Sequence, residues 1–315
     1  MKTFKGLGSV PHGFGPSAVT IGKFDGVHRG HRAVVERLRS IAAADDLRSV
    51  VVTFDRNPLA LLAPEKCPES LVSVRQKLEL LGSTGIDATL LLPFDRALAS
   101  VPATEFVERV LVDTLGAKAV LVGGDFRYGA RGAGDVDLLI ALGGAFGFTV
   151  EVVDDVRPGD DRRVSSTWIR ELLAEGDVRH ATELLGHTPT VSGIVVHGAK
   201  RGRELGYPTA NLSPESEGLI PADGVYAGWL TDAGTRYPAA ISVGNNPTFK
   251  GVQKQVEAYV LDRELDLYDH VVDVEFVDRL RGMVAFTSIP DLVDTMRDDV
   301  DRSRKLLTDP REVPA

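Results

Sequence analysis

Two histidines, His28 and His31, close a glycine-rich segment that begins at Gly22. An apolar run at Ala18–Ile21 predicts a strand before this segment, and apolar spacing predicts a helix from about His28 to Ala44. The first N–H groups of a helix have no partner within it, and its dipole favours negative charge there. Two imidazoles beside such an anion site could stabilise charge that develops on phosphorus during phosphate transfer. The alternative is a helix start that carries two surface histidines.

Three further clusters in the first half of the chain carry groups suited to a nucleotide or a flat ring. Hydroxyls at Ser165–Thr167, followed by Arg170, suit phosphate oxygens, although helix capping explains one of the hydroxyls. Glycines and aromatic residues at Gly123–Gly129 follow a predicted strand, where ligands of open α/β sheets bind, but an ordinary turn is an equal alternative. The segment Phe54–Pro58 also follows a strand and is either a turn or a ligand contact.

The second half of the chain has its own candidate site at Gly198–Asn211. Glycines and basic residues there, including Gly198, Gly202 and Arg203, suit a loop over phosphates. The hydroxyl of Thr209 and the amide oxygen of Asn211 are hard donors suited to Mg²⁺ bound with nucleotide phosphates. A basic surface hairpin is the alternative.

Alternating strand and helix patterns predict the elements that position the first set of residues. The predicted strands are mostly continuous apolar runs typical of a covered parallel sheet; they are Ala18–Ile21, Ser49–Phe54, Ala88–Pro93, Ala119–Val122 and Thr149–Val153. Helical patterns between them include one opened by a capping box at Ser73–Gln76 and one capped by Asp135. This order predicts a doubly wound, Rossmann-like α/β domain with a parallel sheet.

The pattern changes near Gly186–Pro189. Short alternating stretches separated by Gly, Pro and Asn follow, which predicts a small antiparallel β-barrel. An amphipathic helix is expected at Pro290–Leu307. We therefore predict two domains, residues 1–186 and 187–315.

Composition narrows the classes of function. The chain has 315 residues, a net charge of −9 and a single cysteine, Cys67, so an intramolecular disulfide is impossible. The acidic balance argues against nucleic-acid binding. We expect no signal peptide, no membrane span and a cytoplasmic location. The sequence contains no Walker A motif and no cluster of Cys and His typical of a metal site.

Taken together, these motifs resemble those of the prokaryotic bifunctional riboflavin kinase/FAD synthetases, over nearly the whole chain and in family order. The first-half motifs are G-x-F-D-G-V-H-x-G-H at Gly22–His31, the turn at Asp125–Gly129 and S-S-T-x-I-R at Ser165–Arg170. The second-half motifs follow in order; they are Arg201–Asn211, Pro221–Tyr226, Gly244–Phe249 and Val256–Asp262.

The resemblance implies two reactions: a C-terminal kinase converts riboflavin and ATP to FMN, and an N-terminal FMN adenylyltransferase makes FAD and pyrophosphate from FMN and a second ATP. It assigns adenylyl transfer to His28 and His31. It assigns nucleotide binding to Gly22, Phe24, Gly26, Ser166, Thr167 and Arg170, besides the basic loop with Gly198, Gly202 and Arg203. It assigns flavin binding to Asn57, Asp125, Phe126, Tyr128, Arg281 and Phe286. Thr209 and Asn211 would bind Mg²⁺, and Glu257 would be the base of the kinase.

Three other functions compete with this interpretation. A nucleotidyltransferase for another phosphate acceptor would share H-x-G-H but would not need Pro208–Asn211. A catalytically inactive flavin-binding regulator would not need His28, His31, Asn211 and Glu257 intact. A nucleic-acid-binding barrel conflicts with the net charge. The expected partners are therefore riboflavin, FMN and ATP, without nucleic acid or membrane, and the oligomeric state is not predicted.

Overall fold

The computed structural model describes residues 1–157, 162–198, 205–248 and 251–308. Contacts divide the chain into two compact units, Met1–Ser165 and Ser166–Ala315, and each is described by itself. This division falls 21 residues before the boundary predicted from the change in sequence pattern. The predicted domain bounds, residues 1–186 and 187–315, therefore stay a prediction.

The first unit is built on a six-stranded sheet in which every neighbouring pair is parallel, in the order β1-β4-β3-β2-β5-β6. The strands are β1 (Lys2–Lys5), β2 (Ser17–Ile21), β3 (Arg48–Phe54), β4 (Ala88–Leu92), β5 (Ala117–Gly123) and β6 (Thr149–Val153). The predicted parallel α/β fold is confirmed. Strand β1 was not predicted, because only Phe4 of its four residues is buried.

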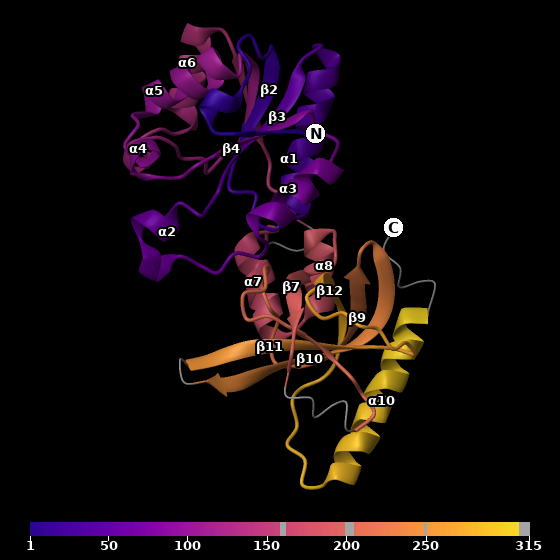
Figure 1. Ribbon diagram of the computed structural model, residues 1–315. Coiled ribbons are helices and arrows are strands. Elements are labelled where there is room, and N and C mark those ends of the chain that lie inside the picture. Colours follow the sequence, from indigo (N-terminus) through magenta and orange to yellow (C-terminus); the bar gives the residue numbers. More distant parts are fainter. Residues whose placement is uncertain (158–161, 199–204, 249–250, 309–315) are drawn as a thin grey trace. The chain divides into compact units, whose positions relative to one another are not determined.

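Helices cover both faces of this sheet (Figure 1). One face carries α1 (Arg29–Ala44) and α3 (Val74–Ser83), whose Leu38 and Leu81 are fully buried in one apolar cluster. The other face carries α5 (Ala103–Phe106), the π-helical segment η3 (Val107–Thr114) and α6 (Val136–Phe146). The remaining short helices are η1 (Leu7–Ser9), α2 (Leu59–Leu62), η2 (Pro64–Lys66), α4 (Arg96–Ala99) and η4 (Ala130–Gly132).

Two of these helices start where the sequence predicts. The Ser73 hydroxyl accepts from the Gln76 N–H, and the Gln76 side chain accepts from the Ser73 N–H, so the predicted capping box is confirmed. Asp135 caps α6 by accepting from the Leu138 N–H at 2.9 Å.

The strand order identifies a switch point at the carboxyl end of β2. From β2 the chain builds outward through β3 and β4 on one side, and through β5 and β6 on the other. Ligands of open α/β sheets bind in the crevice that such a reversal leaves at the strand ends. The segment Gly22–His31 leaves β2 at this point.

The second unit contains a closed antiparallel barrel in the order β10-β11-β8-β7-β12-β9, as the sequence predicts. Its strands are β7 (Thr190–Val196), β8 (Ala210–Leu212), β9 (Gly224–Asp232), β10 (Thr235–Thr248), β11 (Gly251–Val260) and β12 (Val271–Arg281). Alternate residues of β11 are buried, namely Val256, Ala258 and Val260. Helix α10 (Ile289–Thr308) runs beside the barrel, and its Leu307 is buried with residues of β9 and β12 (Figure 1).

Helices α7 (Ser166–Glu175) and α8 (Val178–Leu185) belong to the barrel unit. Helix α8 packs against β12, and Arg179 of α8 pairs with Asp278 of β12 at 2.9 Å. The Arg279 guanidinium donates to the Glu175 carbonyl at the end of α7. A side chain at Gly176 would come within 2.8 Å of Arg279, so a glycine there lets the arginine reach this carbonyl.

Candidate active sites

The first candidate site lies at the start of α1, where His28 is the N-cap. Its Nδ1 accepts a hydrogen bond from the His31 N–H at 3.4 Å. A ring nitrogen that accepts carries no proton, so this bond assigns the ring proton of neutral His28 to Nε2. The His28 and His31 rings stack with centroids 3.7 Å apart and planes 17° from parallel. The structure thus brings the two predicted histidines into direct contact.

Burial determines the protonation state of His31. It lowers the pKa of His31 well below 6.5, and the charges of His28, Lys77 and Lys23 lower it further. The His31 Nδ1 is buried and has no hydrogen-bond partner among the described residues. At neutral pH, before an anion binds, His31 is therefore a neutral ring.

The turn before α1 is strained. Phe24, Gly26 and Val27 all have positive φ, of 49°, 80° and 39°. This region is unfavourable for a β-branched residue such as Val27, and strain of this kind persists only where the surroundings enforce it. Val27 and Phe24 are both buried, and the Phe24 ring lies 4.9 Å from the His31 ring.

The glycine between the two histidines has a steric reason. A side chain at Gly30 would come within 3.1 Å of the His28 ring, so its absence leaves room for that ring. Gly22 is tight for the same kind of reason, since a Cβ there would lie 3.1 Å from the Phe24 ring. The predicted nucleotide contacts Gly22, Phe24 and Gly26 therefore all belong to the turn that carries the histidines.

The predicted flavin contacts of the first unit lie on other loops. The Asn57 side chain accepts from the Leu59 N–H at 3.1 Å, which makes it part of the turn into α2. Asp125 is exposed and pairs with Arg163 at 2.9 Å. Phe126 is half-buried and stacks on Tyr128, whose ring is buried in the apolar core. Burial raises the pKa of Tyr128 to about 12.

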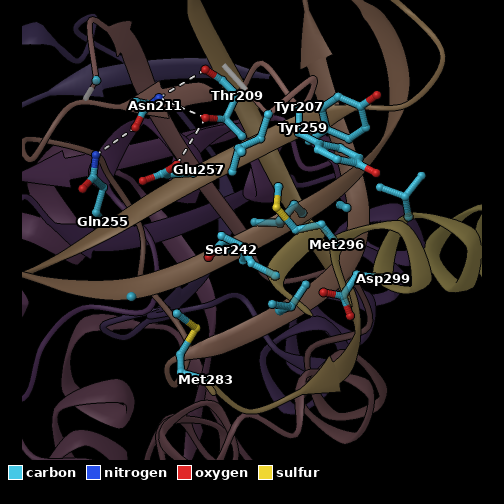
Figure 2. A pocket seen from close by; sticks show the side chains of 18 of the residues that line it. Tyr207, Thr209, Asn211, Ser242, Gln255, Glu257, Tyr259, Met283, Met296 and Asp299 are labelled. Atoms are coloured by element: carbon cyan, nitrogen blue, oxygen red, sulfur yellow. Dashed lines mark hydrogen bonds between the residues drawn. The ribbon is translucent and has the colours of Figure 1, made fainter. Parts of the chain in front are cut away.

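The second candidate site is a cluster of oxygen-bearing side chains on β11, on β8 and on Thr209, which directly precedes β8. Asn211 and Glu257 are direct partners across these strands. The Thr209 hydroxyl donates to Glu257 Oε2 at 3.2 Å, and the Asn211 amide donates to the Thr209 carbonyl at 3.1 Å. Gln255 donates to Asn211 Oδ1 at 2.9 Å. Figure 2 shows these four side chains together at one side of a pocket.

Two hollows meet at this cluster. The larger, of about 650 Å³, lies between the outer face of β10–β11, the segment after β12 and α10. The smaller, of about 400 Å³, is lined on its far side by Arg263, Glu264 and Tyr268. Thr209 and Asn211 line both, as does Gly198. A Cβ at Gly198 would lie 2.5 Å from the Asn211 amide, so glycine is required for this approach.

One wall of the larger hollow is held by an ion pair. The Arg281 guanidinium donates to both carboxylate oxygens of Asp299, at 2.8 to 3.1 Å, and Asp299 of α10 is buried. The Arg281 guanidinium also lies over the Phe286 ring at 5.8 Å from its centroid. Apolar side chains complete the lining; they include Val225, Met283, Val284, Leu292, Met296 and Val300.

Sequence reasoning did not single out Asp299 or the pair Tyr207 and Tyr259. The two tyrosine rings lie edge to face at 5.3 Å beside the cluster (Figure 2). An acidic residue in a charged helix gives no signal of its own, and Tyr207 and Tyr259 come from segments far apart in sequence.

The remaining predicted residues fall outside these two clusters. Ser166, Thr167 and Arg170 lie in the first turns of α7, in the second unit. Gly202 and Arg203 lie outside the described residues. Within the described parts of the chain, no group of three His, Cys, Asp or Glu could hold a metal ion. In the same parts, no helix has the length and apolar character to cross a membrane.

Comparisons with known proteins match both units. A family model described as FAD synthetase matches residues 12–168, and one described as riboflavin kinase matches residues 185–307. A bifunctional riboflavin kinase/FMN adenylyltransferase of Escherichia coli (strain K12) is 37% identical over 294 residues, which cover 93% of each chain. The protein of that name from Pseudomonas fluorescens is 39% identical, and the match covers 97% of this chain and 98% of that one.

A solved structure has a similar fold over nearly the full length. It is described as a macrolide-efflux protein from Streptococcus pneumoniae, and it superposes with a TM-score of 0.87 at 31% identity. The superposition covers 96% of this chain and 99% of that one.

Proposed function

The chain belongs to the bifunctional riboflavin kinase/FMN adenylyltransferase family, and from this premise we propose where each of its two reactions takes place. The riboflavin kinase domain, in the C-terminal part, transfers the γ-phosphoryl group of ATP to riboflavin. The FAD synthetase domain, in the N-terminal part, transfers the adenylyl group of a second ATP to FMN and releases pyrophosphate.

The observation that carries the kinase assignment is the meeting of two hollows at Thr209 and Asn211. We assign the larger hollow to riboflavin, because its apolar lining and volume of about 650 Å³ suit a flat ring system. We assign the smaller to ATP, whose phosphates would then reach the shared residues Gly198, Thr209 and Asn211. Phosphoryl transfer needs the hydroxyl and the γ-phosphate in line, and the shared wall is where they can meet.

Glu257 is the base in this assignment. Its Oε2 accepts from the Thr209 hydroxyl, which fixes the carboxylate on the pocket side of β11. As the riboflavin hydroxyl oxygen bonds to the γ-phosphorus, its proton passes to Glu257 and ADP leaves. Thr209 therefore orients the base.

The same cluster fits Mg²⁺. The Thr209 hydroxyl and the Asn211 side-chain oxygen are hard donors on adjacent side chains, and Asn211 is buried. The Asn211 amide nitrogen lies 3.3 Å from the Thr209 hydroxyl and its oxygen accepts from Gln255, so an ion held by both residues requires the amide to turn over. We propose that these two residues hold the ion together with the nucleotide phosphates. When bound, Mg²⁺ neutralises charge on those phosphates. A site completed by phosphate oxygens needs no cluster of carboxylates.

Arg281 and Phe286 line the hollow that we assign to riboflavin. Because Asp299 neutralises Arg281, the wall of the hollow offers the face of an ion pair, with Phe286 beside it, in place of a free cation. A neutral isoalloxazine ring would pack on such a wall at little electrostatic cost.

Adenylyl transfer is assigned to the start of α1. A phosphate oxygen of FMN attacks the α-phosphorus of ATP, and pyrophosphate leaves. His28 presents an Nε2–H donor at the start of α1, where the helix dipole favours a bound anion. Donors held there by the fold stabilise the charge that develops on the phosphate oxygens. His31 adds its ring and gains a proton most readily once that anion is bound.

The other adenylyltransferase assignments depend on the family resemblance. Ser166, Thr167 and Arg170 are proposed to bind ATP phosphates. Asn57, Asp125, Phe126 and Tyr128 are proposed to lie near the flavin; Phe126 is the better placed of the two aromatics, because the Tyr128 ring is buried in the core.

The test is a time course with riboflavin, ATP and Mg²⁺, in which FMN and ADP should appear first, followed by FAD and pyrophosphate. Thr209→Val should raise the Mg²⁺ concentration needed for FMN formation. Thr235→Val, at an exposed position of β10, is the matched control and should not. An equal Mg²⁺ requirement in both variants would exclude Thr209 as a metal ligand.

A further inference from the structure

Lys77 of α3 is a buried charged residue that no step described so far uses. Its side chain is 8% exposed. The ammonium donates to the Phe54 carbonyl at 2.7 Å and to the Lys23 carbonyl at 3.3 Å. Burial of an ammonium group costs free energy unless the group is hydrogen-bonded or paired. These two hydrogen bonds are therefore needed to keep Lys77 buried.

The two carbonyls belong to neighbouring strand ends. Lys23 opens the strained turn that follows β2, and Phe54 ends β3. The Thr53 hydroxyl donates to the same Lys23 carbonyl at 3.1 Å. Lys77 and Thr53 therefore fix one atom of the turn that delivers His28 and His31, and Lys77 also ties that turn to the neighbouring loop.

These hydrogen bonds can hold the turn in its unfavourable conformation. The positive φ values of Phe24 and Val27 are unfavourable, so the turn would relax unless its surroundings oppose it. On the other side of the turn, Asp25 accepts from the Leu71 N–H at 2.9 Å. The turn is thus fixed at two positions, on either side of Phe24, by the Lys23 carbonyl and the Asp25 carboxylate.

We propose that Lys77 is a positioning residue for adenylyl transfer, which holds the Lys23–Val27 turn in the geometry that presents both histidines to the α-phosphate of ATP. This inference rests on the proposed role of His28 and His31. It adds a residue from a distant helix that contacts neither histidine by a hydrogen bond.

The charge of Lys77 has a second effect that distinguishes positioning from general support of the fold. The charge of Lys77 lowers the pKa of His31, as do the charge of Lys23 and that of His28 in its protonated form. Burial lowers the pKa of Lys77 itself, while Asp25 and Asp55 oppose that effect. Removal of the ammonium should therefore raise the pKa of His31.

The experiment compares Lys77→Met with Lys118→Met in the full chain. Lys118 is exposed on β5, so its variant loses the same charge without loss of a buried contact. For Lys77→Met we expect kcat for conversion of FMN to FAD to fall about 100-fold, because a displacement of about 1 Å has that effect on a catalytic group. Riboflavin phosphorylation should be unchanged, and Lys118→Met should match the wild type in both reactions.

Thr53→Val supplies an independent test, because it removes the other donor to the Lys23 carbonyl and keeps the shape of the side chain. We expect it to lower the same kcat about fivefold, the effect of one hydrogen bond. NMR titration of the His31 ring, assigned from its loss in His31→Gln, should show a raised pKa in Lys77→Met and no change in Thr53→Val.

The proposal is wrong if Lys77→Met is folded and makes FAD at the rate of Lys118→Met, or if it loses both reactions equally. If Lys77→Met does not fold, an unchanged kcat in Thr53→Val would also contradict it. The His28→Ala variant distinguishes failure of this inference from failure of the proposed histidine site. A His28→Ala protein that still makes FAD would refute the histidine site itself, whereas loss of FAD there with a normal rate in Lys77→Met would refute only the role of Lys77.

Discussion

The two candidate sites are built from different parts of the chain. The proposed adenylyltransferase site is a single strand, turn and helix start, and its proposed donors are backbone N–H groups and two histidines within ten residues. The kinase site combines side chains from β8, β10, β11, the segment after β12 and α10. A contiguous site is visible as a sequence motif, whereas a dispersed site depends on the closure of a barrel.

The two sites should also respond differently to the loss of one side chain. In the proposed kinase site one carboxylate, Glu257, would take the proton, so its removal would leave a formed pocket without its base. In the proposed adenylyltransferase site several donors would share the charge, so removal of one would leave the others. Substitutions should therefore have the largest effect in the kinase.

Glu257→Gln should lower the rate of riboflavin phosphorylation by about 10²–10⁴-fold, the usual contribution of a general base. The amide keeps the size of the side chain and can still accept from Thr209, so riboflavin binding should persist. Conversion of supplied FMN to FAD should be unchanged. FMN and ADP are measured by chromatography, and near-normal turnover would exclude Glu257 as the base.

His28→Ala should lower FAD formation by roughly 10²–10³-fold, as expected for one lost electrostatic donor, while FMN accumulates from riboflavin. Mixed with Glu257→Gln protein, it should restore conversion of riboflavin to FAD, because each variant supplies the reaction that the other lacks. Failure of the mixture, with each variant active in its own reaction, would mean that the two sites in one chain depend on each other.

A pair of fragments tests where the kinase part begins. Ser166–Ala315 keeps α7 and α8, whereas Gly186–Ala315 loses buried leucines such as Leu173 and Leu184 and the Arg279 contact with α7. Two buried leucines alone stabilise by about 3 kcal/mol or more. We expect both fragments to contain the riboflavin site but the shorter one to unfold at lower denaturant concentration. Equal midpoints would show that α7 and α8 contribute nothing to the barrel.

The sequence predicted most of the sheet and the barrel, because their strands bury apolar residues with a regular pattern. It missed β1 and the three-residue strand β8, since one buried residue or three positions give no period. The apolar spacing of α1 predicts Val34, Leu38, Ile41 and Ala42 on its buried face. Leu38 and Ala42 are buried, but at the start of the helix Val35 is the buried residue and not Val34. Such errors of one position are expected where the helical period is read from few residues.

The sites were predicted unevenly for the same physical reason. His28 and His31 lie within one local motif, so their contact could be expected. Lys77 could not, because a lysine in an amphipathic helix looks solvated until its fold partners, the carbonyls of Lys23 and Phe54, are known. Asp299 is a similar case, since the packing of α10 beside β12 brings it to Arg281.

The smallest expected effect concerns the acid stability of the first unit. The pKa of His31 lies well below 6.5 in the folded chain and near 6.5 when unfolded. As pH falls below about 6.5, His31 of the unfolded chain binds a proton, whereas His31 of the folded chain does not. The free energy of unfolding therefore falls. The loss is at most about 1.4 kcal/mol for each pH unit until the folded pKa is reached.

The two units make this effect measurable, because both tryptophans, Trp168 and Trp229, lie in the second one. An unfolding transition seen by circular dichroism but not by tryptophan fluorescence therefore belongs to the first unit. Between pH 7 and 5.5 we expect its midpoint to move to lower denaturant concentration in the wild type and to move less in His31→Gln. Pyrophosphate should reduce the shift in the wild type, since a bound anion favours the charged ring. Equal shifts in the two proteins would mean that His31 is already protonated, or exposed, in the folded chain.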